Sequence, residues 1–117
     1  MSKVKLDYLW LDGYETPNIR SKTKYIDCED VNLNTIPEWA FDGSSTKQAD
    51  GDSSDCILKP VKVYENTIDF SGNSYIVLCE VMNTNGTPHK SNTRAKLREV
   101  INEDLDMWFG IEQEYVF

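Results

Sequence analysis

Two glutamates near the end of the sequence, Glu112 and Glu114, have the side-chain type and spacing of a metal-binding pair. They lie within residues 108–117, an apolar and aromatic run that predicts a β-strand. Alternate side chains of a strand point to the same face, so the two carboxylates would lie about 6–7 Å apart along the backbone. Carboxylate oxygens suit Mg²⁺ and Mn²⁺, and a bound cation would relieve the repulsion between the two charges. The alternative is the solvated face of an edge strand.

A second set of residues suited to chemistry lies at residues 41–45, which read Phe-Asp-Gly-Ser-Ser. Gly43 allows a sharp turn, and a short carboxylate such as Asp42 can cap that turn locally. The same carboxylate could instead bind a cationic substrate and accept a proton from it. The residue types alone favour the capping role.

Four runs of apolar and β-branched residues predict a sheet that would position these groups. The first run alternates and ends at Asp12-Gly13, whereas the fourth is almost continuously apolar, as in a central strand that is buried on both faces. Pro60 in the third run indicates an edge position or a bulge. The expected strands are residues 6–11, 20–26, 56–64 and 75–81.

The segments between the strands predict helices and loops. A short helix is expected within residues 27–38, where Pro37 would end it. Residues 41–55 are rich in Asp, Gly and Ser and predict a long loop, which is uncommon in a small domain unless the loop has a function. Asn92 is a favourable N-cap for a second helix, because apolar residues follow it at helical spacing, at Leu97, Val100, Ile101 and Leu105.

Length and composition favour one globular domain with its own core, since the chain has 117 residues of which 39% are hydrophobic. The net charge of −8 argues against nucleic acid and anionic membranes as partners. No apolar stretch has transmembrane length and the N-terminal residues do not resemble a signal peptide, so a cytoplasmic location is expected. The three cysteines form no Cys-x-x-Cys pair and are expected to be free thiols. His89, the sole histidine, is expected to be a solvated linker residue.

Several motifs together resemble the N-terminal part of glutamine synthetase, of the eukaryotic-like type that also occurs in some bacteria. Each motif alone is weakly specific, but they follow the order and the approximate spacing of the family over nearly the whole chain. They are residues 8–13 (YLWLDG), 20–24 (RSKTK), 37–49 (PEWAFDGSSTKQA), 86–88 (GTP), 92–94 (NTR) and 108–115 (WFGIEQEY).

The resemblance implies an α+β fold: a β-grasp (ubiquitin-like) mixed sheet over residues 1–87, followed over residues 88–117 by the start of the catalytic α/β domain. It also implies a reaction, the ATP-dependent ligation of ammonia to the side-chain carboxylate of L-glutamate through a γ-glutamyl phosphate. The family uses Mg²⁺ or Mn²⁺ and assembles into rings of identical subunits. Each active site lies between the β-grasp domain of one subunit and the catalytic domain of the next.

The resemblance assigns roles to individual residues. Asp42 would help to bind and deprotonate ammonium in the neighbouring subunit's site, and Ser45 would help to hold the loop or the site closed. Glu112 and Glu114 would be metal ligands, and the ion on Glu112 would also contact ATP. Trp108 would lie near the nucleotide, although simple packing of this large aromatic side chain is an equal alternative.

The chain departs from the family at Ser71-Gly72-Asn73, in the linker at Asn85, His89 and Lys90, and above all in length. Because it stops at the first metal-ligand strand, we expect a truncated protein that is inactive alone and exposes apolar surface around residues 108–117. Two alternatives remain open from the sequence. One is a ligase that joins glutamate to a different amine, and the other is a non-catalytic β-grasp binding module.

Overall fold

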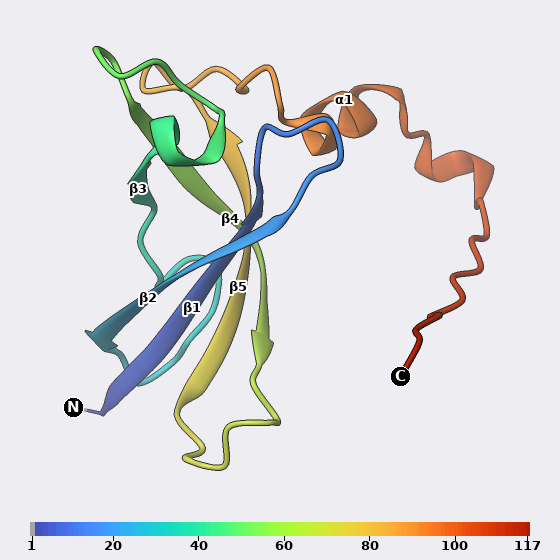
Figure 1. The fold of residues 1–117 in the computed structure, drawn as a ribbon. Coiled ribbons are helices and arrows are strands. Elements are labelled where there is room, and N and C mark those ends of the chain that lie inside the picture. The colour runs from blue at the N-terminus through green and yellow to red at the C-terminus, as the bar shows by residue number, and fades with distance from the viewer. Residues whose placement is uncertain (1) are drawn as a thin grey trace.

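The computed structural model describes residues 2–117, and its strands form one mixed sheet with the order β2-β1-β5-β4-β3 (Figure 1). The antiparallel β1–β2 hairpin lies at one edge, and β1 pairs in parallel with β5 at the centre. The antiparallel pairs β5–β4 and β4–β3 complete the sheet. The strands are β1 (Lys3–Leu11), β2 (Ile19–Asp27), β3 (Trp39–Asp42), β4 (Asp55–Glu65) and β5 (Ser74–Met82).

Alternation along β1 builds the core, because Val4, Leu6, Tyr8 and Trp10 all point to one face and are buried. Side chains from β3, β4 and β5 share that core with Ile36 from the β2–β3 connection. The Tyr8 hydroxyl donates to the Pro37 carbonyl at 2.6 Å, which fixes this connection over the sheet. The predicted strands over residues 6–11, 20–26, 56–64 and 75–81 are therefore confirmed, each with longer bounds.

Pro60 causes the irregularity that its position predicted. The pairing of β4 with β5 shifts register between Pro60 and Lys62, as in a β-bulge. β3 pairs with β4 only as far as Leu58, so Pro60 also lies on an edge where no N–H group is needed.

The prediction of a helix within residues 27–38 is wrong, because this connection consists of turns. Side chains satisfy its backbone locally: the Asn32 N–H donates to Thr35 Oγ1 at 2.9 Å, and the Asn34 N–H donates to Asn32 Oδ1 at 2.9 Å. Such bonds compete with helical ones. The long loop expected at residues 41–55 is shorter in the structure, since β3 extends to Asp42 and the 3₁₀ helix η1 (Gly43–Thr46) follows it.

The helix predicted after Asn92 is confirmed as α1 (Thr93–Val100), with Asn92 Oδ1 accepting from the Ala95 N–H at 3.0 Å. It ends before Leu105, which lies in the short 3₁₀ helix η2 (Glu103–Leu105). Ala95 is buried, but the larger apolar side chains of this region are exposed, including Leu97, Val100 and Ile101.

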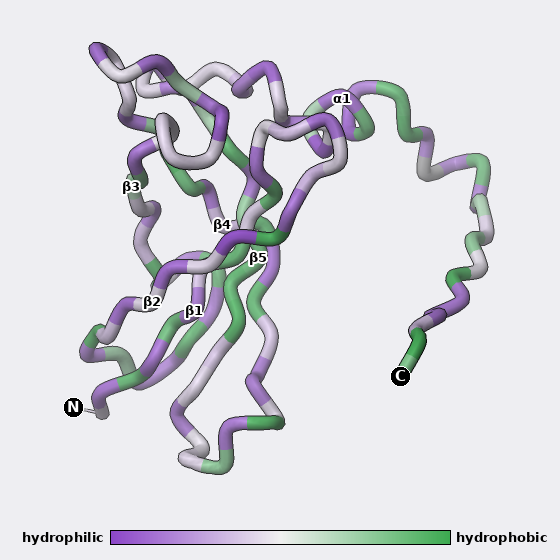
Figure 2. The backbone as a smooth tube through the Cα atoms, viewed as in Figure 1, coloured by the Kyte–Doolittle hydropathy of each residue, from purple (hydrophilic) through white to green (hydrophobic). Residues whose placement is uncertain are grey.

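The strand predicted over residues 108–117 is wrong, because residues 106–117 have no regular structure. Figure 1 shows this tail running away from the sheet beyond α1, and Figure 2 shows that it contains both hydrophobic and hydrophilic stretches. A strand requires a hydrogen-bonded neighbour, and the tail lies beside none of β1 to β5. The predicted exposure of apolar residues here is confirmed, since Trp108 is 91% and Ile111 94% exposed.

Candidate functional site

Asp42 ends β3 and caps η1 with its own side chain. The carboxylate accepts from the Ser44 N–H at 2.9 Å and from the Ser44 hydroxyl at 2.6 Å, while the Ser45 hydroxyl donates to the Asp42 carbonyl at 3.0 Å. A Cβ on Gly43 would lie 2.7 Å from Cys56 Sγ, so the turn can pass β4 only because this residue is glycine. The capping role that the residue types favour is thus present, and Asp42 and Ser45 are part of the same turn.

The Asp42 carboxylate remains exposed to solvent despite these hydrogen bonds. Hydrogen bonds from the Ser44 hydroxyl and the Ser44 N–H stabilise its charged form and lower its pKa. Asp42 is therefore ionised well below neutral pH. An exposed anion fixed on a rigid turn can attract a cation from outside the domain.

An open depression of about 390 Å³ lies beside this turn, and Asp42 and Ser45 are on its rim together with Arg20 and Lys22 of β2. The Lys22 ammonium donates to the Ala40 carbonyl at 2.6 Å and lies 3.9 Å from the centre of a Trp39 ring. These contacts hold Lys22 against β3 rather than against the Asp42 carboxylate.

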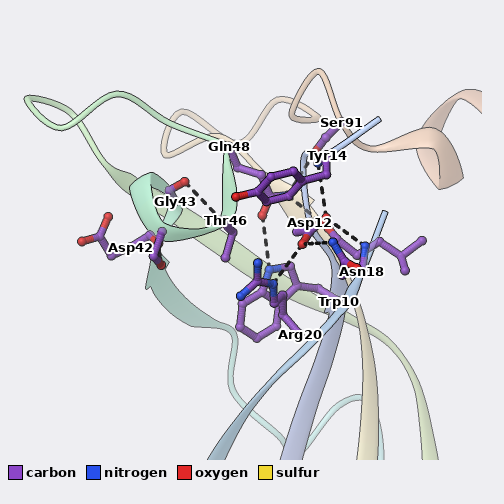
Figure 3. Close-up of polar contacts among 12 residues, drawn as sticks. Trp10, Asp12, Tyr14, Asn18, Arg20, Asp42, Gly43, Thr46, Gln48 and Ser91 are labelled. Atoms are coloured by element: carbon purple, nitrogen blue, oxygen red, sulfur yellow. Dashed lines mark hydrogen bonds and ion pairs between the residues drawn. The ribbon is translucent and has the colours of Figure 1, made fainter. Parts of the chain in front are cut away.

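An ion pair between the buried Asp12 and the partly exposed Arg20 lies at the end of β1 (Figure 3). Asp12 is 2% exposed and accepts from Arg20 Nε at 2.9 Å, from the Asn18 N–H at 2.9 Å and from Asn18 Nδ2 at 3.1 Å. Burial raises the pKa of Asp12, but the hydrogen bonds from Asn18, Arg20 and Tyr14 together outweigh it and lower the pKa to about 2. The sequence predicts Asp12 only as a turn residue, although pairing in a hairpin would bring Arg20 opposite Trp10, near Asp12.

The turn after Asp12 packs directly on η1. The Gly13 N–H donates to the Thr46 carbonyl at 2.9 Å, and a Cβ on Gly13 would lie 2.2 Å from the Lys47 carbonyl oxygen. Lys47 itself has a left-handed backbone, with φ of 57°, where it caps the end of η1. The hairpin turn therefore fixes the far side of η1 and, through it, the position of Asp42.

Glu112, Glu114 and Trp108 are exposed and belong to the tail of residues 106–117, which Figure 1 shows apart from β3. Among the side chains that the structure describes, no three of His, Cys, Asp or Glu come close enough together to hold a metal ion. The oxygen chemistry of the two glutamates fits Mg²⁺ or Mn²⁺, but two carboxylates do not make a complete site for either ion. The structure therefore groups Asp42 with Ser45 and leaves the other predicted site residues apart.

The solvent exposure of His89 also differs from the prediction. The residue is 6% exposed rather than solvated, and both ring nitrogens have hydrogen-bond partners. The expectation was wrong because one partner is the carbonyl of Gln48, far away in the sequence. Pro88, which precedes His89, forms an isolated β-bridge with Met82.

Comparison with known proteins identifies the class of this fold. Residues 3–84 match the family model described as the β-grasp domain of glutamine synthetase. The chain belongs to this family, and the mixed sheet described above confirms the predicted β-grasp fold.

Individual relatives extend the similarity beyond the sheet. The chain is 51% identical over 120 residues to a glutamine synthetase of Bradyrhizobium diazoefficiens and 52% identical over 116 residues to one of Streptomyces viridochromogenes. It is 44% identical over 121 residues to a chloroplastic glutamine synthetase of Chlamydomonas reinhardtii. These alignments cover 100%, 97% and 93% of this chain but 33%, 34% and 32% of the relatives. The chain thus spans about a third of the length of the curated relatives it matches.

No helix in the described part of the chain has the length and the apolarity needed to cross a membrane.

Proposed function

We propose that this chain forms the N-terminal part of a glutamine synthetase of the eukaryotic-like type, which makes glutamine from L-glutamate, ammonium and ATP through a γ-glutamyl phosphate. The main support is the 51% identity to a glutamine synthetase over the whole chain, which includes both the Asp42 turn and the tail. Relatives of comparable identity come from bacteria and from eukaryotes. The cytoplasmic location stays a prediction, favoured by three free cysteines.

Asp42 is the residue we assign to the ammonium step. Its exposed, ionised carboxylate would attract ammonium and accept a proton from it, which releases the ammonia that attacks the acyl phosphate. Ser45 would act on the same turn, because its hydroxyl holds the Asp42 backbone. The turn faces outward, which suits a site that a neighbouring subunit of a ring completes.

The remaining assignments concern the tail and the domain boundary. In the full-length protein Glu112 and Glu114 would supply two ligands for Mg²⁺ or Mn²⁺, and Trp108 would pack near the nucleotide. When bound, the cation would neutralise phosphate charge. We place residues 1–87 in the β-grasp domain and residues 88–117 at the start of the catalytic domain. The chain alone lacks most of that domain, and we expect it to form no glutamine.

The test uses the full-length reading frame that contains this chain and measures ATP-dependent glutamine formation. Asp42→Asn removes the proton acceptor but keeps the turn, so kcat/KM for ammonium is expected to fall by about 10²–10³-fold. The matched control is Asp50→Asn, which neutralises an exposed carboxylate of the next loop and leaves the kinetics unchanged.

Two results would contradict the proposal. No glutamine formation by the full-length protein would favour a binding module, and a strong preference for another primary amine over ammonium would favour a related glutamate ligase. Equal kinetics of Asp42→Asn and Asp50→Asn would remove Asp42 from the mechanism.

A further inference from the structure

Gln48 lies in the loop after η1, and both its side chain and its backbone form hydrogen bonds with other segments. The residue is 3% exposed, and its carboxamide joins segments that are far apart in sequence. Its Oε1 accepts from Trp10 Nε1 at 3.3 Å, and its Nε2 donates to the Leu11 carbonyl at 3.2 Å and to Ser91 Oγ at 3.0 Å (Figure 3). The side chain therefore connects the end of β1 with the segment that leads into α1.

The backbone of Gln48 makes a second connection to that segment. Its N–H donates to the Gly43 carbonyl at 2.8 Å, and its carbonyl oxygen accepts from His89 Nε2 at 2.5 Å. Because a carbonyl can only accept, Nε2 must carry the imidazole proton. The Ser91 N–H donates to His89 Nδ1 at 3.1 Å, which requires a lone pair there and fixes a neutral ring.

The segment that Gln48 holds is also attached to the sheet and to α1. The His89 N–H donates to the Val81 carbonyl at 3.1 Å, and Asn92 Nδ2 donates to the same carbonyl at 3.0 Å. Glu80 is buried and pairs with Arg98 of α1 at 2.8 Å. An unbroken set of contacts thus runs from Gly43 of η1 through Gln48 to the start of α1.

We propose that Gln48, His89 and Ser91 are positioning residues that lock the Asp42 turn to the linker before α1, so that the two move as one rigid body. We call these three residues the Gln48 cluster. None of them touches substrate in this proposal; they act through Asp42 and Ser45. The importance of this lock for catalysis rests on the proposed function, whereas its existence does not.

The first experiment uses Ser91→Ala in the 117-residue chain and measures amide hydrogen exchange by NMR. The variant removes the acceptor of one Gln48 carboxamide donor and leaves that donor buried. We expect the amides of Gln48 and Ala49 to exchange about tenfold faster, although they lie more than 40 residues from the substitution in sequence. Amides in the centre of β1 and β5 should keep their exchange rates.

Two variants serve as controls. Ser71→Ala removes an exposed hydroxyl from the turn before β5 and should leave amide exchange unchanged at residues 48–49 and 88–92. Ser91→Thr keeps the hydroxyl and should restore slow exchange at Gln48 and Ala49. Faster exchange confined to residues 88–92, or a uniform increase over the whole sheet, would overturn the proposed coupling.

A second measurement does not require any variant to fold. Long-range ¹H–¹⁵N spectra of the unmodified chain should show His89 as the neutral tautomer with its proton on Nε2. A proton on Nδ1, or a rapidly averaging ring, would overturn the proposed role of the Gln48 carbonyl.

The link to catalysis is tested in the full-length protein. Ser91→Ala should lower kcat/KM for ammonium about fivefold to tenfold and leave KM for ATP unchanged, because it removes contacts to Gln48 and His89 and none in the tail proposed to lie near the nucleotide. Faster exchange at Gln48 and Ala49 in Ser91→Ala, combined with unchanged ammonium kinetics for Asp42→Asn, would refute the proposed function. It would still support the coupling between the Asp42 turn and the linker. Unchanged amide exchange at Gln48 and Ala49 in Ser91→Ala would refute the coupling between the Asp42 turn and the linker, whatever the kinetics of Asp42→Asn.

Discussion

Two of the Asp-Gly turns in this chain place chemically identical carboxylates in opposite surroundings. Asp12 is buried and bound by Arg20 and Asn18, which come from the neighbouring side of the hairpin. Asp42 is exposed, and its carboxylate accepts hydrogen bonds from Ser44 of its own turn. The carboxylate of the Asp-Gly dipeptide therefore stabilises the fold at Asp12, where its partners lie across the hairpin. At Asp42, where it caps its own turn, the carboxylate stays available for chemistry.

The largest expected effect comes from the glycine of each turn. A Cβ at position 13 would meet the Lys47 carbonyl oxygen at 2.2 Å, a backbone atom, whereas one at position 43 would meet the Cys56 sulfur at 2.7 Å. We expect Gly13→Ala to lower the free energy of unfolding by about 3 kcal/mol or more, and Gly43→Ala by about 1–3 kcal/mol. Urea unfolding measures both.

Gly51→Ala is the matched control, because no atom lies within 4 Å of its added Cβ. Its effect should stay within about 0.5 kcal/mol. A Gly43→Ala variant less stable than Gly13→Ala would show that η1, and not the hairpin turn, is the tighter contact.

The next effect comes from neutralising each carboxylate. Asp12→Asn turns an acceptor of Arg20 Nε into a buried amide group and should lower Tm clearly. Asp42→Asn keeps an acceptor for the Ser44 N–H and should leave Tm nearly unchanged. Thermal melting of the two variants side by side measures the contrast, and equal losses would mean that Asp42 also stabilises the fold.

The smallest effect is a difference in acid sensitivity. The pKa of Asp12 falls from 3.8 to about 2 in the folded state, so its contribution to stability is complete above pH 3.8 and is lost as pH falls towards 2. The pKa of Asp42 is also lowered, which gives the same sign. Asp12→Asn should flatten the dependence of stability on pH in this window more than Asp42→Asn. A steeper curve for Asp12→Asn would contradict the lowered pKa.

The predicted parts of the fold are those that local pattern determines. Alternation predicts β1, residues of high β-propensity predict β2, a continuous apolar run predicts β5, and Asn92 marks the start of α1. The helix predicted within residues 27–38 failed because local side-chain hydrogen bonds compete with helical ones. The other error arose where a distant partner decides the outcome. Residues 108–117 have the composition of a strand but no neighbour to pair with.

The candidate site shows the same division. The Asp42 turn could be predicted, because its hydrogen bonds join residues that are adjacent in sequence. The burial of Asp12 and His89 could not, since it depends on Arg20 across a hairpin and on a carbonyl 41 residues away. A short-range pattern carries no signal for such contacts.

The parallel pairing of β1 with β5 constrains the order of events during synthesis on the ribosome. The hairpin of β1 and β2 can form early, but the inner edge of β1 stays open until residues 74–82 have emerged. Until then β1 presents unpaired backbone groups and an uncovered apolar face to other nascent chains. A translational pause before β5 would therefore lengthen the time during which this domain can aggregate.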